Sequence, residues 1–248
     1  MAERRHVESC LHELLRPDLF KDYGPNGLQV EGRTEVRRIA SGVTASLAFI
    51  DAALAQGADT LVVHHGLFWR GHDGCLTGWL KARVARLLAA DVNLFAYHLP
   101  LDAHPELGNN AQLGRQLGLQ ADARFGDQSL GFIGDGHGAT ARALAAHVQA
   151  TLGREPVLLP GDGRPLRRVA WCSGGAQGFF EDAIAAGADA FITGELSEPQ
   201  AHLARETGVA FLACGHHATE RYGAPAVAAH VAAQLQVEHR FIDIDNPA

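Results

Sequence analysis

The sequence predicts an α/β fold built from two similar lobes, each a mostly parallel sheet flanked by helices. Two observations lead to this prediction. Residues 37–63 resemble residues 167–193 without gaps, and in both copies short apolar runs alternate with alanine-rich helical segments. An internal repeat fixes the architecture, and strands that alternate with helices are typical of parallel sheets. The 248 residues leave room for two lobes, because a typical domain holds about 150 residues.

The composition is that of a folded chain, with 47% hydrophobic and 20% charged residues. A net charge of −7 argues against a general nucleic-acid binder, because such proteins need a basic surface to neutralise phosphates. No apolar run approaches the roughly 20 residues that cross a bilayer. Met1–Leu15 is predicted to form a short amphipathic helix and lacks the apolar core of a signal peptide. We therefore expect no membrane partner.

The four cysteines are far apart and form no Cys-x-x-Cys pair. This spacing excludes a zinc knuckle or a dithiol redox motif. The simplest interpretation is four reduced, buried side chains in a cytoplasmic protein.

Short motifs at equivalent positions mark the boundaries of the elements in the repeat. Each copy opens on an arginine pair, at 37–38 and 167–168, and each helical segment ends in Gly-Ala-Asp, at 57–59 and 187–189. Further strands and helices follow in the same order in both copies. They are predicted at Thr60–Val63, Trp79–Ala90 and Val92–Tyr97 in the first copy, and at Ala190–Thr193, Pro199–Thr207 and Val209–Cys214 in the second.

A connector separates the two copies. It contains a glycine-rich stretch at Gly126–Gly138, a predicted helix near Ala139–Leu152 and a turn-rich segment at Pro156–Pro165. We therefore expect a first α/β lobe over residues 1–125, and the connector with the second lobe over residues 126–248.

Histidines and carboxylates follow the predicted strands at their carboxyl ends, where ligands bind in open α/β sheets. The first copy has His64-His65-Gly66 after one strand and His98-Leu99-Pro100-Leu101-Asp102 after the next. The second copy has Gly194-Glu195 and then Gly215-His216-His217-Ala218-Thr219-Glu220.

These residue types at these spacings predict a centre for two metal ions. Successive side chains of a strand point to opposite sides, so His64 and His65 suit two neighbouring ions. His216 and Glu220 are one helical turn apart and share a face, and Glu220 has two oxygens with which to bridge the ions. Asp102 adds a carboxylate to one ion. Imidazoles with carboxylates suit zinc, iron or manganese, so we expect a metal cleft between the lobes with open positions for water and substrate.

Each cluster, taken singly, also has an ordinary explanation. A His-His pair can simply bond to backbone at a strand end, and His-x-x-x-Glu can be a solvated helix face. Asp102, two residues before His104, can cap the following helix. Three such clusters at predicted strand ends favour metal binding. The remaining histidines are interpreted as surface or packing residues: His6, His12, His72, His137, His147, His202, His230 and His239.

At these residues the sequence resembles the GTP cyclohydrolase I type 2 family, also called the Nif-three-like dinuclear-metal family, and in particular its compact bacterial members. The resemblance covers nearly the whole chain. It runs through Tyr23-Gly24-Pro25-Asn26-Gly27-Leu28-Gln29-Val30-Glu31-Gly32, His64-His65-Gly66, Leu99-Pro100-Leu101-Asp102, Gly108-Asn109-Asn110, Thr193-Gly194-Glu195 and Gly215-His216-His217-Ala218-Thr219-Glu220.

The resemblance implies a ligand set, an assembly and an activity. It places metal ligands at five positions, with the last bridging both ions: His64, His65, Asp102, His216 and Glu220. It also implies a toroidal homohexamer whose metal sites face an internal cavity. Some relatives carry a large extra domain between their halves, and this connector is too short to hold one.

The function we expect is metal-dependent hydrolysis of a purine nucleotide. In a GTP cyclohydrolase reaction, activated water attacks C8 of guanine, the imidazole ring opens and formate leaves. His98 is the candidate proton-transfer group, with orientation of a metal ligand as the alternative role. Glu195 is expected to line the cleft or to stabilise a helix N-terminus.

Two other functions stay open at this point. Two-metal sites most often cleave phosphoesters, and basic residues near the metals would favour a phosphorylated substrate. The candidates are Arg70, Lys81, Arg83 and Arg221. The other alternative is a metal-binding ring or regulatory scaffold without catalysis. Asn26-Gly27 is predicted to form a turn, and Gln29 to pack or to hydrogen-bond around the site.

Overall fold

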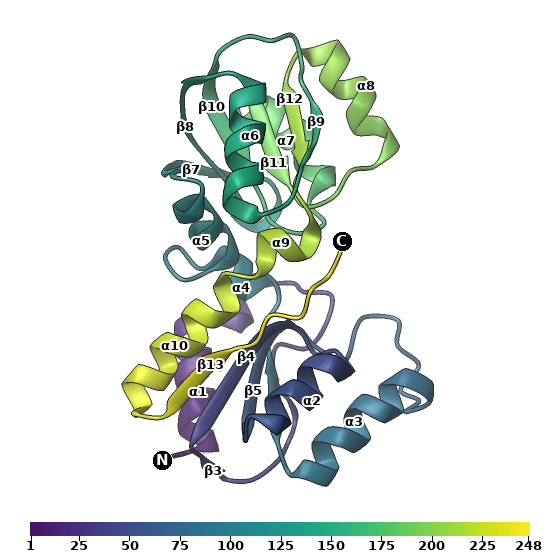
Figure 1. The fold of residues 1–248 in the computed structure, drawn as a ribbon, viewed down its shortest axis with the longest axis vertical. Helices are drawn as coiled ribbons and strands as arrows, with labels where there is room; N and C mark the ends of the chain where they lie inside the picture. The colour runs from purple at the N-terminus through teal and green to yellow at the C-terminus, as the bar shows by residue number, and fades with distance from the viewer. The chain divides into compact units, whose positions relative to one another are not determined.

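The computed structural model describes residues 1–248 and divides them into two compact units (Figure 1). The first unit contains Met1–Gly108 and Arg221–Asp245, and the second contains Asn109–Glu220 and Asn246–Ala248. This division differs from the expected boundary after residue 125. Strand β7 (Ala121–Phe125) pairs with β8 (Gly131–Ala139) in the sheet of the second unit, and residues 221–245 return to the first. Sequence order alone could not reveal that return.

The first unit contains a five-stranded sheet in the order β13-β4-β5-β6-β2. Four of its strands are parallel, and β2 runs antiparallel at one edge. The mostly parallel sheet predicted for this lobe is therefore confirmed. The strands are β2 (Gly27–Val30), β4 (Arg38–Thr44), β5 (Thr60–His65), β6 (Asn93–Ala96) and β13 (Glu238–Phe241).

Helices cover both faces of this sheet. Leu61 and Val63 of β5 pack with helices α2 and α3, whereas Val62 packs with α1 and α10. Alternate residues of a strand point to opposite faces, so one apolar run serves two cores. In Figure 1 the α2 and α3 helices lie on one face, and α1 and α10 on the other. The helices are α1 (Arg4–Leu15), α2 (Leu47–Ala55), α3 (Gly78–Ala90), α4 (Leu99–Ala103) and α10 (Gly223–Leu235), with a 3-10 turn, η1, at Pro17–Leu19.

The second unit contains a six-stranded sheet in the order β7-β8-β10-β11-β12-β9. Only β10, β11 and β12 pair in parallel, so the sheet is mixed and not mostly parallel. The parallel strands are those of the repeat, and the connector supplies antiparallel neighbours on both sides. These strands are β9 (Val157–Leu159), β10 (Leu166–Trp171), β11 (Ala190–Thr193) and β12 (Ala210–Ala213).

Most of the glycine-rich stretch of the connector lies in β8. Glycine is depleted in strands, so its presence here needs a structural reason. A side chain at Gly134 would overlap the carbonyl oxygen of Gln120 beside it, so the close approach of two backbones demands glycine here.

The helices of the second unit complete the repeat. The order β4-α2-β5-α3-β6-α4 of the first unit recurs as β10-α7-β11-α8-β12-α9. The predicted repeat is thus confirmed as a structural one. The helices are α5 (Asn109–Gln116), α6 (Ala141–Leu152), α7 (Phe180–Ala185), α8 (Glu198–Thr207) and α9 (His216–Glu220), with 3-10 turns η2 (Asp127–Ser129) and η3 (Gln177–Phe179).

The aspartate of the Gly-Ala-Asp motif makes the same hydrogen bonds in both copies. Oδ2 of Asp59 accepts hydrogen bonds from the backbone nitrogens of Arg37 and Arg38, at 2.8 and 3.1 Å. Oδ2 of Asp189 accepts the equivalent bonds from residues 167 and 168, at 2.9 and 3.1 Å. In each copy, the aspartate just before the second strand therefore satisfies two backbone N–H groups near the start of the first strand.

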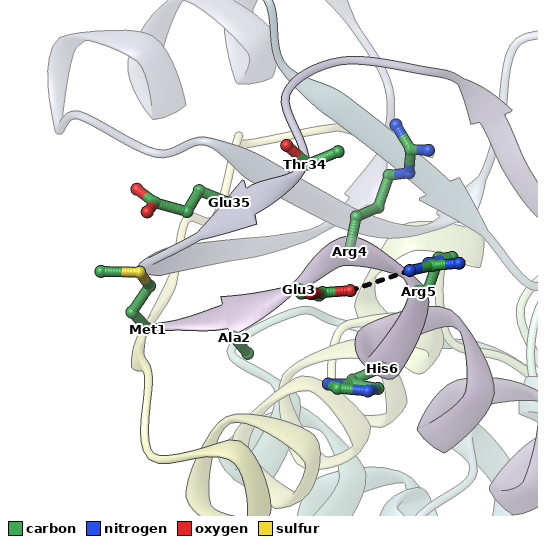
Figure 2. Close-up of a pocket in the computed structure, with 8 residues that line it drawn as sticks. All are labelled: Met1, Ala2, Glu3, Arg4, Arg5, His6, Thr34 and Glu35. Carbon is green, nitrogen blue, oxygen red and sulfur yellow. Dashed lines mark hydrogen bonds and ion pairs between the residues drawn. The ribbon is translucent and has the colours of Figure 1, made fainter.

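A polar hollow of about 780 Å³ lies beside a two-stranded antiparallel sheet of β1 (Ala2–Glu3) and β3 (Glu35–Val36). Figure 2 shows its lining, in which Arg5 turns back to Glu3 at 3.2 Å. Arg4 pairs instead with Glu31 at 2.7 Å. None of the predicted metal ligands lines this hollow. No helix of the chain is long and apolar enough to span a bilayer.

Candidate metal centre

His64 and His65 are the last two residues of β5. His64 is 1% exposed, and its Nδ1 lies 3.0 Å from the carbonyl oxygen of Tyr97. A carbonyl only accepts, so Nδ1 carries the proton and Nε2 keeps the lone pair that binds a metal. His65 places Nδ1 3.1 Å from Oγ1 of Thr44. The two imidazole centroids are 4.5 Å apart, so both rings lie together at the strand end.

Asp102 lies on α4, the short helix that follows β6, and is 7% exposed. Its Oδ1 is 3.5 Å from Nε2 of His64. Two ligands that share one ion at about 2.1 Å lie roughly 3 to 3.5 Å apart. The nitrogen of His64 and the oxygen of Asp102 are therefore spaced as ligands of a common ion would be.

His98 lies between β6 and α4 and joins this cluster. Its ring centroid is 5.0 Å from that of His64 and 5.8 Å from that of His65. One ligand atom from each of the three histidines falls within 4.8 Å of the others. His98 differs from the other two in its second contact, because its Nδ1 faces a carboxylate, Oδ1 of Asp22, at 2.7 Å.

Asp22 and Asn26 were missed as site residues by the sequence analysis. Asp22 accepts hydrogen bonds from the His98 ring and from the backbone nitrogen of Leu99, and Asn26 accepts one from the backbone nitrogen of His98 at 2.7 Å. The segment that resembles the family begins at Tyr23 and includes the Asn26-Gly27 turn. That polar turn was the available signal, and its partners lie more than 70 residues away along the chain.

Gln29 joins two loops beside the cluster. Its Oε1 accepts from the backbone nitrogen of Leu67 at 2.7 Å, and its Nε2 donates to the carbonyl oxygen of Pro25 at 2.8 Å. A side chain at Gly66 would overlap the Gln29 amide. The loop after His65 is thereby held in place, as expected for a residue that hydrogen-bonds around a site. A cavity of about 10 Å³ beside Gln29, His64 and His98 has the volume of about one water molecule.

The second unit contains a separate histidine–carboxylate set on α9. Nε2 of His216 lies 3.2 Å from Oε2 of Glu220, which is 3% exposed. Nδ1 of His216 lies 2.6 Å from Oε1 of Glu195. Burial alone would lower the pKa of His216, but hydrogen bonds and charge from Glu220 and Glu195 outweigh it and raise that pKa to about 9. Glu195 therefore orients His216, the arrangement in which a carboxylate fixes a metal-binding imidazole.

A glycine loop after β10 makes room for the Glu220 carboxylate. Gly174 has a φ of +68°, and a side chain there would overlap Oε1 of Glu220. Its backbone nitrogen donates to Oγ1 of Thr219 at 2.9 Å. The preceding Ser173 donates its backbone nitrogen to Oδ1 of Asn110 at 2.7 Å. Asn110 of the Gly108-Asn109-Asn110 motif thus holds the Ser173-Gly174 loop that lies against the Glu220 carboxylate.

The donor atoms of both units fit a divalent transition metal. Each unit offers imidazole nitrogens together with a nearby carboxylate oxygen, and no thiolate takes part. The second ring nitrogen of His64, His65 and His216 already has a partner in the protein. That arrangement leaves Nε2 as the ligand atom and favours zinc, iron or manganese over calcium or magnesium.

Of the four cations expected to favour a phosphorylated substrate, Arg70 contacts the Asp22–Tyr23 segment, whose Asp22 side chain bonds to His98. Its guanidinium lies 5.5 Å from the Tyr23 ring centroid and donates to the carbonyl oxygen of Asp22 at 2.9 Å. Arg83 packs over Trp79 on α3 instead. Arg221 has its NH1 3.8 Å from Asp243, and Lys81 is exposed on α3.

Several remaining histidines serve packing or surface contacts, as expected. His12 contacts the hydroxyl of Tyr97 at 3.0 Å, and His147 the carbonyl oxygen of Leu117 at 3.1 Å. His239 contacts Oγ of Ser41 at 2.8 Å. His202 pairs with Glu198 on the exposed face of α8.

Comparisons with known proteins agree with the fold. Two proteins named "GTP cyclohydrolase 1 type 2 homolog" are similar over almost their whole length. The one from Neisseria meningitidis serogroup A is 53% identical and covers 100% of both chains, and the one from Escherichia coli K12 is 46% identical and covers 98% of both. A solved structure described as "protein ybgI, unknown function" has 45% identity and a TM-score of 0.95, covering 99% of this chain and 100% of that one.

A second solved structure, from Thermus thermophilus, has 34% identity and a TM-score of 0.88, covering 99% of this chain and 100% of that one. The family model described as Duf34/NIF3 (NGG1p interacting factor 3) matches residues 2–247. The match spans both copies of the repeat and the residues of both histidine–carboxylate sets. The chain therefore belongs to the Duf34/NIF3 family.

Proposed function

We propose that this chain is a dinuclear metal-dependent hydrolase that acts on a purine nucleotide. In this proposal two ions of iron, zinc or manganese would be held by five ligands, with Glu220 serving both ions: His64, His65, Asp102, His216 and Glu220. The observation that carries the proposal is that each unit contains a histidine with a carboxylate within 3.5 Å at the end of its repeat. The choice of a nucleotide as substrate rests on the relatives' name, GTP cyclohydrolase 1 type 2 homolog.

The position of the two sets in the repeat supports one shared centre. Helices α4 and α9 follow equivalent strands, β6 and β12, so each copy delivers its carboxylate from the same point of the fold. Ligands in open α/β sheets bind beyond the carboxyl ends of the strands. A duplicated unit in which each copy carries part of the ligand set is a simple origin for a two-metal site.

When bound, two ions lower the pKa of a water molecule toward about 7 and polarise the substrate. The chain's own residues hold and orient these groups. The carboxylates of Asp102 and Glu220 offset the charge of the ions, while Tyr97 and Glu195 fix the rings of His64 and His216. In a GTP cyclohydrolase reaction, water adds at C8 of guanine and formate leaves, and His98 moves a proton at Nε2.

Metal analysis and product analysis together test the proposal. The chain is purified, stripped of metal and reconstituted separately with iron, zinc and manganese, and its metal content and nucleotide products are measured by mass spectrometry. We expect two ions per chain and release of formate from GTP. Glu220→Gln should lower the content of both ions, whereas His216→Ala should lose mainly one. A content near zero, or an undiminished content in Glu220→Gln, contradicts the proposed ligand set.

Phosphoester cleavage is the second candidate, and it is favoured by the cationic Arg70 on the Asp22–Tyr23 segment that contacts His98. The same assay separates the two reactions, because phosphoester cleavage releases a phosphate group or a nucleotide fragment and no formate. Arg70→Gln should raise the KM for a phosphorylated substrate in either case. If the chain carrying two ions releases neither product, a metal-binding ring or regulatory scaffold replaces the hydrolase.

A further inference from the structure

The segment from Asp22 to Asn26 packs against the corner at which β6 turns into α4. That corner carries His98 and Leu99, and Asp102 follows within one helical turn. The Asp22 side chain is 3% exposed although it is charged. A buried carboxylate is costly unless its oxygens are hydrogen-bonded. The hydrogen-bond donors that contact Asp22 therefore indicate its role.

Four donors converge on this carboxylate. Oδ1 accepts from the backbone nitrogen of Tyr23 at 2.6 Å and from Nδ1 of His98 at 2.7 Å. Oδ2 accepts from Nδ2 of Asn26 and from the backbone nitrogen of Leu99, both at 2.9 Å. Burial alone would raise the pKa of Asp22, but the hydrogen bonds from His98, Asn26 and Tyr23 outweigh burial and hold the pKa at about 2.

An ionised carboxylate only accepts hydrogen bonds. The hydrogen in the 2.7 Å contact must therefore belong to Nδ1 of His98. In a neutral imidazole the other nitrogen, Nε2, is then without a proton and can accept one. The carboxylate thus decides which nitrogen of His98 is available for chemistry.

Asn26 makes the arrangement rigid. Its Nδ2 donates to Asp22, and its Oδ1 accepts from the backbone nitrogen of His98 at 2.7 Å. The ring of His98 is held through Nδ1, and its backbone is held by the neighbouring side chain. Trp69 packs against the ring with centroids 5.0 Å apart and planes at 89°. The His98 ring is thus contacted on several sides at once.

We infer that Asp22, held by Asn26, is a positioning residue that keeps His98 in its Nδ1–H tautomer and presents an unprotonated Nε2 beside His64 and His65. The consequence for catalysis rests on the proposed function, in which His98 moves a proton. The tautomer itself does not depend on that function. The same pair also assigns a role to the Asn26-Gly27 turn, since Asn26 is the residue that connects the turn to the site.

Nitrogen-15 NMR of the metal-free chain tests the tautomer directly. Two-bond proton–nitrogen correlations of the imidazoles are recorded at about pH 8.5, and the His98 signals are assigned by their loss in His98→Gln. We expect the Nδ1–H pattern in the wild type and in the control Asp18→Asn, which removes an exposed carboxylate outside the network. A wild-type His98 in the Nε2–H form overturns the inference, and this measurement needs no variant at position 22.

Asp22→Asn keeps the size of the side chain and replaces one acceptor oxygen with a donor. Four donors then compete for a single oxygen, so we expect the Nε2–H form of His98 to appear. Zinc content should stay close to that of Asp18→Asn, because no ligand has changed. An unchanged Nδ1–H pattern in a folded Asp22→Asn chain overturns the inference.

Steady-state kinetics separate this inference from the proposed function. With an active wild type, Asp22→Asn should lower kcat by about a hundredfold, the usual scale of acid–base assistance, with KM changed by less than about threefold. Asp22→Glu, which keeps the carboxylate, should recover part of the loss. If the NMR result is as expected but the loaded wild type turns over no nucleotide, the proposed function fails and the positioning role stands. If Asp22→Asn has the same kcat as Asp18→Asn, the claim that Asp22 assists catalysis through His98 is wrong.

Discussion

At the level of single residues, each histidine proposed as a metal ligand is oriented by the partner of its second ring nitrogen. His216 is oriented by Glu195, His64 by a backbone carbonyl and His65 by a threonine hydroxyl. Glu195 is the only one of these partners that brings a charge. Its contribution is therefore open to a test that keeps the shape of the side chain.

Glu195→Gln should weaken metal binding at His216. The amide keeps the size of the side chain but loses the negative charge that holds Nδ1–H of His216, so the imidazole becomes a poorer ligand. We expect a 10- to 100-fold loss of zinc affinity, measured by competition with a chelating dye. The matched control is Glu198→Gln, which changes an exposed glutamate paired with His202. Equal affinities in the two variants would show that Glu195 does not support the ligand.

The lowered pKa of Asp22 also predicts how the stability of the chain depends on pH. Its folded pKa of about 2 lies below the ordinary value of 3.8, so its contribution is present above pH 3.8 and is lost as the pH falls through about 2. The free energy of unfolding of the wild type should therefore fall across this window. Asp22→Asn should be less stable at neutral pH and show a shallower fall, as measured by urea unfolding at several pH values. Parallel pH profiles for the two chains would contradict this prediction.

At the scale of elements, short loops after the strands bring the functional side chains into place. The loop after β10 is the clearest case, because Gly174 lies against the Glu220 carboxylate with a positive φ. Two separate constraints, the lack of space and the left-handed backbone, both demand glycine there.

Gly174→Ala should displace Glu220 and lower the metal content of the second unit's ligand set. The left-handed backbone alone costs about 1 to 2 kcal/mol for a non-glycine residue, and the overlap with the carboxylate adds to this cost. Metal content by mass spectrometry and thermal unfolding of the metal-free chain are the measurements. Gly178→Ala is the control, since a side chain there has open space and an ordinary φ. A Gly174→Ala chain with the full metal content would refute the role of the glycine loop.

At the scale of the whole molecule, the prediction concerns assembly. The family resemblance implies a ring of six chains, and the chain of 26.4 kDa should then have about six chain masses in light scattering. The measurement is made at several concentrations, with and without added zinc. A monomer under all of these conditions would contradict the ring of six chains and, with it, the internal cavity that the resemblance implies.

Most elements of the repeat were predictable because their signals are local. Alternating apolar residues, alanine-rich segments and the Gly-Ala-Asp punctuation mark strands and helices within a few residues of each boundary. Strand β11 (Ala190–Thr193) has its predicted bounds. Five proposed ligands stand out in the sequence by their spacing and their place after a strand, and their binding of metal stays a prediction: His64, His65, Asp102, His216 and Glu220.

The repeated β-α order, the parallel strands at its centre and the histidines and carboxylates at their ends can thus be predicted from local sequence patterns. Which strands flank the parallel core, where the units divide and which groups orient the histidines depend on the three-dimensional fold. Asp22 reaches His98 across 76 positions and Glu195 reaches His216 across 21. Such contacts leave no periodic pattern in the sequence, because they depend on where the folded backbone brings two distant side chains together.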